Sequence, residues 1–457
     1  MTRKARVALV SLGCPKNLVD SQVMLGLLEA AGYEIVDETE DADVAIVNTC
    51  SFIAPAEEEA VDALLDLADL KQGRLKALIC AGCLTERHGH ELLDEFAEVD
   101  AFVGVGGIPS IAETVARALT GERFFVEAPR DYLYRGELPR LHTGRSWMSY
   151  LKIADGCDHQ CAFCTIPSIR GGYRSVPMGD VVAQFEALVR EGFSEVTLIG
   201  QDTSAYGRDL QPRTTLLELL DRLSEVGYDG WLRLLYLYPS LVADDLIARL
   251  CSGPPFVPYF DIPLQHVSRD VLRAMRRPGS AETYLELIGR IRRADPRAAI
   301  RTTFIVGHPG ETEQDFEALL EFVGAARLDR VTAFVYSPEE GTPSAEMGEQ
   351  VDSELALERL DELMRVQEEV SLEINRGFVG GQMRVLLENP STRRDLWFGR
   401  TYRDAPDVDT QIRVDTRDYK GKPEPGDFVQ VKIEAAEVHD LQGRIVNISA
   451  PNSEKEH

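Results

Sequence analysis

Three cysteines stand close together in the middle of the chain, at Cys157, Cys161 and Cys164; we call them the compact triad. Thiolates at such spacing bind metals, but a structural zinc site normally takes four ligands, and no fourth cysteine lies nearby. A 4Fe-4S cluster is also held by thiolates, and three of them leave one iron open to a ligand from outside the protein. The motif therefore favours such a cluster over three unrelated cysteines in a core turn.

Three further cysteines are far apart in the sequence, at Cys14, Cys50 and Cys83; we call them the dispersed triad. Each follows a short aliphatic run that is typical of a parallel strand, and ligand sites of open α/β sheets gather where such strands end. We therefore expect these thiols to converge on a second cluster, although three separately buried small residues would give the same pattern. The remaining Cys80 and Cys251 are expected to pack as small hydrophobic residues.

The first part of the chain must position the dispersed triad. It alternates strands with amphipathic helices, which predicts a parallel α/β sheet domain over residues 1–127, followed by a Pro-, Arg- and Gly-rich linker over residues 128–142. The expected strands cover residues 6–11, 44–49 and 75–81, and the expected helices cover residues 21–31 and 56–70.

The second part must position the compact triad. Residues 143–375 repeat a strand followed by a helix six times, which predicts a partial (βα)6 barrel of TIM-like type with its chemistry at the C-terminal strand ends. The expected strands cover residues 149–153, 195–199, 232–238, 259–263, 299–306 and 330–336, and the expected helices include residues 180–190, 281–294 and 353–373.

The third part, residues 376–450, alternates short strands with Gly, Pro and Asp turns and ends in a tail at residues 451–457. This pattern predicts a small all-β barrel of about five strands. The expected strands cover residues 383–388, 411–414, 428–434 and 444–448.

The overall composition excludes several classes of protein. The 457 residues are 44% hydrophobic and 27% charged, as in globular domains, and no apolar run is long enough to span a bilayer, so we expect no membrane partner. Eight cysteines are too few for a disulfide scaffold of this length, which favours a cytoplasmic protein. The net charge of −27 argues against broad nucleic-acid binding and favours a basic partner.

Both triads resemble those of a known family. The compact triad resembles the signature of the radical S-adenosylmethionine (SAM) superfamily. The dispersed triad ahead of it and the small β domain behind it resemble the methylthiotransferase family over essentially the whole chain. The resemblance implies a cluster-binding domain, a radical SAM domain and a TRAM domain, which is an OB-like barrel. It also implies two 4Fe-4S clusters, each held by one triad, with SAM as co-substrate.

Two stretches resemble the branch of this family that modifies a ribosomal protein. Residues 12–17 read LGCPKN, whereas the enzymes acting on tRNA usually have Gln-Met-Asn after the first cysteine, and residues 399–409 resemble the TRAM motif of the ribosomal branch. The branch implies addition of a methylthio group to the β-carbon of an aspartate in the twelfth protein of the small ribosomal subunit. Methylthiolation of a tRNA adenosine is the alternative, and a non-enzymatic iron–sulfur redox sensor is a third hypothesis.

The distribution of charge favours the first of these hypotheses over the second. Residues 1–142 hold 13 basic and 25 acidic side chains, whereas residues 376–450 hold 12 of each. A TRAM domain that grips tRNA needs cations for the phosphates, so a neutral domain with an acidic stretch at residues 404–409 suits a basic ribosomal protein better and makes tRNA an unexpected partner. A merely solvated acidic surface would give the same composition.

Residues near the compact triad and the second strand of the expected barrel are candidates for binding SAM. By resemblance to the superfamily, Gly200 and Gln201 would hold the methionine amino group, unless they form an ordinary turn. Arg170 and Arg174 follow the compact triad and could pair with a carboxylate, or could lie in an ordinary surface loop.

Two later strand ends supply further candidates. Gln265 or His266 could line the site, although a neutral structural histidine is equally consistent with the sequence. By resemblance to a family motif, Gly307 and its neighbours would shape the adenosine pocket, while Glu311 could instead cap the following helix.

The family resemblance also implies the course of the reaction. The cluster of the compact triad would reduce SAM to a 5′-deoxyadenosyl radical, which removes a hydrogen from the substrate, and the cluster of the dispersed triad would present a methylated sulfur. Such chemistry consumes two SAM per product and needs an electron donor such as flavodoxin or ferredoxin. The sulfur donor is left open by the sequence.

Overall fold

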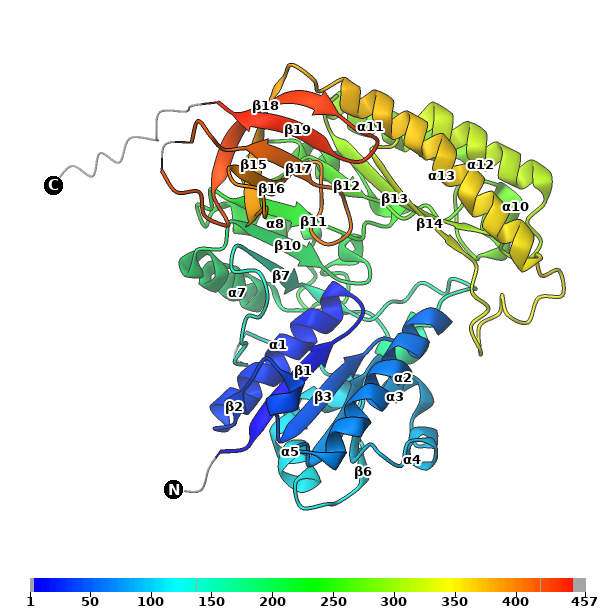
Figure 1. Cartoon of the computed structure of the whole chain (residues 1–457). Coiled ribbons are helices and arrows are strands. Elements are labelled where there is room, and N and C mark those ends of the chain that lie inside the picture. Colours follow the sequence, from blue (N-terminus) through cyan, green and yellow to red (C-terminus); the bar gives the residue numbers. More distant parts are fainter. Residues whose placement is uncertain (1–3, 137, 420, 447–457) are drawn as a thin grey trace.

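The computed structural model describes residues 4–136, 138–419 and 421–446. Figure 1 shows three parts, with the N-terminal sheet at the bottom, the larger α/β part in the middle and a small β-barrel at the top. One hydrophobic cluster joins all three, since it includes Val23, Tyr150 and Leu386. The expected tail at residues 451–457 and the end of the last expected strand lie outside the described residues. No helix in the described ranges is both long and apolar enough to cross a membrane.

The N-terminal part is a six-stranded parallel sheet in the order β2-β1-β3-β4-β5-β6. The central strands β3 and β4 are buried along their whole length because helices cover both faces. Three strands were expected, and the short β2, β5 and β6 were missed because two or three residues show no periodicity. The strands are β1 (Arg6–Ser11), β2 (Glu34–Ile35), β3 (Val44–Thr49), β4 (Ala77–Gly82), β5 (Ala101–Val103) and β6 (Phe124–Val126).

The helices of this part begin soon after the strands end, which keeps the connecting loops short. The first helix begins at Pro15 rather than at the expected residue 21, because proline suits the first turn of a helix, where its missing N–H costs nothing. The helices are α1 (Pro15–Ala30), α2 (Ala54–Asp69), α3 (Cys83–His88), α4 (Glu91–Glu95) and α5 (Ile111–Ala118).

The middle part is an open barrel of six parallel strands, as expected. It consists of two sheets, β7-β10-β11 and β12-β13-β14, and the backbone N–H of Leu237 donates to the carbonyl of Asp261 (2.9 Å) where the sheets meet. The strands are β7 (Met148–Lys152), β10 (Glu195–Ile199), β11 (Trp231–Leu234), β12 (Tyr259–Asp261), β13 (Ala299–Val306) and β14 (Arg330–Val335). The expected strand at residues 232–238 ends early because Tyr236 adopts a left-handed backbone conformation with φ 63°.

Helices cover the outside of this barrel, and the long α13 packs against α12 and β14 (Figure 1). A short antiparallel pair, β8 (Ala154–Asp155) and β9 (Arg174–Ser175), brackets the compact triad. The helices are α6 (Ile166–Arg170), α7 (Met178–Glu191), α8 (Leu216–Ser224), α9 (Asp244–Leu250), α10 (Arg269–Ala274), α11 (Ala281–Ala294), α12 (Glu313–Ala326) and α13 (Ser353–Arg376).

The C-terminal part is a closed five-stranded barrel in the order β15-β16-β17-β19-β18, which confirms the expected small β-barrel. The strand β16 was not predicted as a strand, because its residues, LWFGRT, do not alternate apolar with polar. The last expected strand, at residues 444–448, overlaps β19 only at its first two residues, because β19 begins at Leu441 and ends at Ile445. The strands are β15 (Gln382–Pro390), β16 (Leu396–Thr401), β17 (Ile412–Asp415), β18 (Phe428–Ala436) and β19 (Leu441–Ile445).

The expected linker between the first two parts lies against α1 and β7. The Leu141 N–H donates to the Gln22 carbonyl (2.9 Å), and Arg140 donates both to the Gln22 side chain (Nε–Oε1 2.9 Å) and to the Tyr150 carbonyl (2.9 Å). These bonds place the segment between the N-terminal sheet and the barrel.

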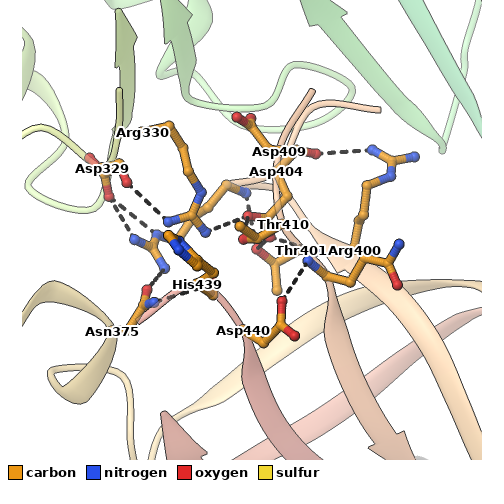
Figure 2. A network of polar contacts seen from close by, with 12 residues as sticks. Asp329, Arg330, Asn375, Arg400, Thr401, Asp404, Asp409, Thr410, His439 and Asp440 are labelled. Carbon is orange, nitrogen blue, oxygen red and sulfur yellow. Dashed lines mark hydrogen bonds and ion pairs between the residues drawn. The ribbon is translucent and has the colours of Figure 1, made fainter. Parts of the chain in front are cut away.

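Two of the three aspartates in the stretch at residues 404–409 are not available as the acidic surface that the sequence suggested, whereas Asp407 is exposed. Asp404 is buried and pairs with Arg330 of β14 (2.5 Å), as Figure 2 shows, and its pKa falls below the ordinary value because Arg330 and Arg403 outweigh the effect of burial. Asp409 is also buried, with Arg301 at 3.3 Å and the Tyr259 hydroxyl at 2.5 Å. These acids attach the C-terminal barrel to the middle part, so they cannot meet a basic partner.

Candidate active site

The three cysteines of the dispersed triad lie at the C-terminal ends of adjacent strands. Cys14 directly precedes α1, Cys50 directly follows β3, and Cys83 is the first residue of α3. The backbones also approach closely: a Cβ atom on Gly13 would lie 2.5 Å from the Cys50 Cβ and 3.0 Å from its Sγ, and Gly13 has φ +83°. Only glycine fits this position without strain.

The thiols of this triad are close enough to influence one another. Burial raises the pKa of Cys83 to about 12; the Arg170 guanidinium opposes this rise, whereas Cys14 and Cys50 add to it. Burial, followed by the charge of Cys14, likewise raises the pKa of Cys50. Thiolates gathered in such a place need a positive group to offset their charge, and iron supplies one together with a preference for sulfur ligands. The donor set therefore fits an iron–sulfur cluster.

The compact triad lies in the loop between β8 and α6, and backbone bonds hold this loop in place. The Cys157 N–H donates to the Gly171 carbonyl (3.1 Å), and the Cys164 N–H donates to the Cys161 carbonyl (3.2 Å). Burial raises the pKa of Cys157 to about 11 and that of Cys164 to about 12, and in both cases neighbouring thiolates of the triad add to the shift. This set of three partly buried sulfur donors also fits a cluster.

All eight cysteines are free thiols. Within the described ranges, no three His, Cys, Asp or Glu side chains are placed to hold a single metal ion. A cluster containing several irons is larger than one ion and takes ligands that are farther apart. Of the two cysteines outside the triads, Cys80 is fully buried in the core of the N-terminal sheet and Cys251 packs partly buried beside the barrel core, as expected.

Several side chains around the compact triad were not singled out from the sequence. Arg277 Nη1 lies 3.5 Å from the Cys161 sulfur, and its guanidinium stacks over the Tyr238 ring at 4.6 Å. The His159 ring stacks on the same Tyr238 ring, with 3.8 Å between the ring centres, and its Nε2 lies 2.7 Å from Asp202 Oδ2. Tyr238 follows the end of β11, so an aromatic residue at a barrel strand end was the signal available in the sequence.

Arg170 connects the two triads. It ends α6, directly after the compact triad, yet its Nη2 lies 3.4 Å from the Cys83 sulfur and 2.5 Å from Asn17 Oδ1. Its Nη1 pairs with Asp20 of α1 at 2.7 Å. The sequence left open whether Arg170 pairs with a carboxylate. In the structure its partner is the carboxylate of Asp20, in the N-terminal part of the chain.

The partners of Arg170 belong to a wider buried network. Lys152 Nζ lies 2.5 Å from Asp20 Oδ1 and 3.0 Å from Asp155 Oδ2. Gln201 Nε2 donates to Asp155 Oδ1 (2.9 Å). The network therefore runs from the dispersed triad through two buried cations to the end of β10. A second contact joins the loops that follow the triads, since Thr165 Oγ1 donates to the Phe52 carbonyl (3.4 Å).

Two of the predicted SAM-binding side chains have an unfilled acceptor. The Oε1 atoms of Gln201 and Gln265 are buried without a hydrogen-bond partner, and Gln265 has a left-handed backbone with φ 71°. Buried amide oxygens normally accept a hydrogen bond, so each has room for a donor from a ligand. A Cβ added to Gly200 would lie 3.4 Å from the Ala154 carbonyl oxygen, an ordinary van der Waals distance, so the backbone there is not tightly enclosed.

The structure places the remaining candidates in supporting positions. Arg174 donates to the carbonyls of Gly172 (2.6 Å) and Arg170 (3.0 Å). Gly307 lies against α13, where a Cβ would be 2.6 Å from Ala356 Cβ. His266 Nδ1 accepts from the backbone N–H of Ser268 (3.0 Å), which supports the structural alternative for this histidine.

Glu311 does not cap α12 as the sequence allowed. Thr312 caps that helix, in a capping box with Asp315. Glu311 instead accepts from the Gly307 N–H (3.0 Å) and pairs with Arg359 of α13 (2.7 Å). It therefore fixes the turn after β13.

Lys16 and Tyr236 meet where the N-terminal sheet faces the barrel. The Lys16 ammonium lies 3.5 Å from the centre of the Tyr236 ring. Burial lowers the pKa of Lys16, but Tyr236 and Cys14 outweigh this effect, and the pKa is raised above its ordinary value. Neither residue was predicted to belong to the site.

Comparisons with known proteins agree with this architecture. Residues 6–104 match "Uncharacterized protein family UPF0004", residues 151–323 match the radical SAM superfamily, and residues 379–446 match the TRAM domain. The solved structure of TsrM, a radical S-adenosylmethionine methyltransferase from Kitasatospora setae, superposes with a TM-score of 0.54 at 14% identity, covering 85% of this chain and 79% of that one. This likeness concerns the fold alone.

Curated relatives match over nearly the full length. The chain is 44% identical to "Ribosomal protein uS12 methylthiotransferase RimO" of Pelobacter propionicus, over 97% of this chain and 98% of that protein. It is 45% identical to the protein of the same name from Trichlorobacter lovleyi, again over 97% and 98%. The chain therefore belongs to the family of RimO-type radical SAM methylthiotransferases.

Proposed function

We propose that this protein adds a methylthio group to the β-carbon of an aspartate in ribosomal protein uS12. The contact between Arg170 and Cys83 carries the proposal, because it joins the loop of one triad to a cysteine of the other. A carbon–sulfur bond at an unactivated carbon needs both a radical source and a sulfur source within reach of the same atom. The relatives named for uS12 and the LGCPKN stretch support this substrate.

We assign one 4Fe-4S cluster to each triad. When bound, the clusters and SAM supply the electron, the radical and the sulfur for the reaction. The chain itself holds the loops in place, through the backbone bonds around the compact triad and the close approach of Gly13 to Cys50. An external donor such as flavodoxin or ferredoxin would supply the electrons.

The SAM-binding residues follow from the unfilled acceptors. Gln201 and Gln265 each have a buried Oε1 without a partner, which suits the methionine ammonium of SAM. Gly200, Arg174 and Gly307 would shape the surroundings of SAM through backbone positions and the loops that they hold, because their own contacts are with other parts of the chain.

Intact-mass analysis of small-subunit ribosomal proteins tests the proposal. Cells with and without the gene should differ in uS12 by the replacement of one hydrogen with a methylthio group. Restoring the gene should restore the shift, and restoring it with Cys161→Ala should not. An unchanged uS12, together with loss of a methylthio nucleoside from tRNA, would show that the substrate is tRNA.

A further inference from the structure

Lys16 is a buried cation without an acidic partner. Its side chain belongs to a residue that is only 9% exposed, and no carboxylate oxygen in the described part of the chain lies within ion-pair distance of its ammonium. Buried charges in proteins are normally paired, because an unpaired one loses its hydration without compensation. The face of the Tyr236 ring compensates for part of this loss.

The other buried cations around the triads already have partners. Lys152 and Arg170 share Asp20 and Asp155, and Arg301 pairs with Asp261 at 3.0 Å. Two further cations donate to the chain without a carboxylate: Arg277 donates to the Pro263 carbonyl and Cys161, and Arg174 donates to the carbonyls of Gly172 and Arg170. Lys16 differs from these because, in the described ranges, its ammonium meets neither a carboxylate nor a backbone carbonyl, and its neighbour is the Tyr236 side chain.

Tyr236 is held rigidly beneath Lys16. Its backbone N–H donates to Asp261 Oδ2 (3.0 Å), and its carbonyl accepts from the Thr203 N–H (3.0 Å). These bonds support the left-handed conformation (φ 63°), which an aromatic residue rarely adopts without such support. The result is an aromatic platform at the end of β11 that positions the lysine.

Lys16 also lies in the region that a substrate must reach. It is two residues from Cys14 of the dispersed triad, while Tyr236 is two residues from Tyr238, next to the compact triad.

We propose that the Lys16 ammonium binds the side-chain carboxylate of the substrate aspartate and thereby holds its β-carbon between the two triads. This inference rests on the proposed function, which makes the substrate an aspartate. The carboxylate is bonded directly to the reacting carbon, so one ion pair fixes that carbon within a narrow region.

A double-mutant cycle tests this pairing. The holoenzyme, loaded with both clusters and kept without reductant, is titrated with uS12 and with uS12 whose target aspartate is changed to asparagine. In the unmodified enzyme the asparagine should weaken binding about tenfold, as expected for loss of a charged hydrogen bond. In Lys16→Gln the same change should alter binding less than about twofold. Lys16→Arg should restore part of the preference for aspartate.

Two controls separate this role from others. Lys422→Gln removes an exposed lysine and should leave the tenfold preference unchanged. The iron and sulfide contents of Lys16→Gln test a second role, in which the lysine only offsets the charge of the dispersed triad. If that is its only role, Lys16→Gln molecules that keep both clusters would still prefer aspartate, and the proposal would be wrong.

A zero-length carbodiimide cross-link gives a second measurement that needs no variant of the enzyme. Activation of the substrate aspartate should produce an amide bond to Lys16, which is located by peptide mass spectrometry. The proposal would be overturned if that aspartate became linked to another lysine, or if the two substitutions in the double-mutant cycle had independent effects on binding.

Two outcomes distinguish this proposal from the proposed function. If the unmodified enzyme leaves uS12 without a methylthio group, the proposed function fails. If it modifies uS12 and the cycle shows no coupling, only the role of Lys16 fails.

Discussion

The two triads each bring together three thiols, but they do so in different ways. The compact triad lies in one loop, whose backbone bonds, such as that from Cys164 to Cys161, arise within a few residues. The dispersed triad exists only because β1, β3 and β4 are neighbours in one sheet and end at the same edge. The cysteines of the compact triad are therefore already neighbours in the sequence, whereas the dispersed triad is brought together only by the packing of a whole domain.

Removing one cysteine from each triad should give the largest effects and should separate their roles. Cys161→Ala is expected to abolish formation of 5′-deoxyadenosine, because the compact triad then lacks a ligand for the cluster that binds SAM. Cys50→Ala should keep part of this activity and lose sulfur insertion. Chromatography of deoxyadenosine and the mass of uS12 measure both, and Cys251→Ala is the control. Normal sulfur insertion by Cys50→Ala would show that the role assigned to the dispersed triad is wrong.

A substitution at Gly13 should damage the dispersed triad while leaving all six cysteines in place. In Gly13→Ala the new Cβ meets the Cys50 Cβ at 2.5 Å, at a backbone φ of +83° that also strains alanine. We expect roughly half of the bound iron to be lost, the share of one cluster of two, as measured by iron and sulfide analysis.

Gly89→Ala is the matched control for Gly13. It also has a positive φ, +60°, but no atom lies within 4 Å of the added Cβ. It should therefore cost about 1 kcal/mol of backbone strain and keep the full iron content. Equal iron contents in the two variants would mean that close approach at Gly13 is not required.

Breaking the link between the triads should have a smaller effect, on stability. Arg170→Met removes the partner of Asp20 and Asn17, although Asp20 keeps Lys152. We expect the free energy of unfolding in urea to fall by about 2 kcal/mol, the cost of leaving buried polar groups incompletely paired. Arg174→Met removes bonds to carbonyls only, from a partly exposed side chain, and should cost less than about 1 kcal/mol. A similar loss in both variants would contradict the special position of Arg170.

The sequence predicted the elements with strong periodicity. Strands β1, β3, β10 and β13 and helix α11 have the expected bounds, because each is marked by a continuous aliphatic run or by apolar residues that recur with a clear period. The short edge strands and β16 were missed for want of such a period. The early end of β11 was also missed, since the conformation of Tyr236 depends on bonds to Asp261 and Thr203, which are distant in the sequence.

The charge pattern shows most clearly what composition cannot decide. The sequence places three aspartates in residues 404–409, which suggested a surface for a basic partner. In the structure Asp404 is buried against Arg330 (Figure 2), and the Asp409 side chain is buried against Arg301, because each carboxylate is compensated by a guanidinium from the neighbouring part of the chain. The third aspartate, Asp407, stays exposed. Whether a charge is free or paired depends on residues far away in the sequence.

The sequence by itself determined the ligand types, the order of three domains and the local form of the compact triad, because these depend on residue identity and short-range spacing. Only the tertiary structure brought Cys14, Cys50 and Cys83 to one sheet edge, placed Arg170 against Cys83 and left Lys16 without a carboxylate. Contacts of this kind join segments that are far apart in the sequence, as Arg170 and Asn17 are, at a separation of 153 residues. Their formation depends on how the folded domains pack, which no local pattern specifies.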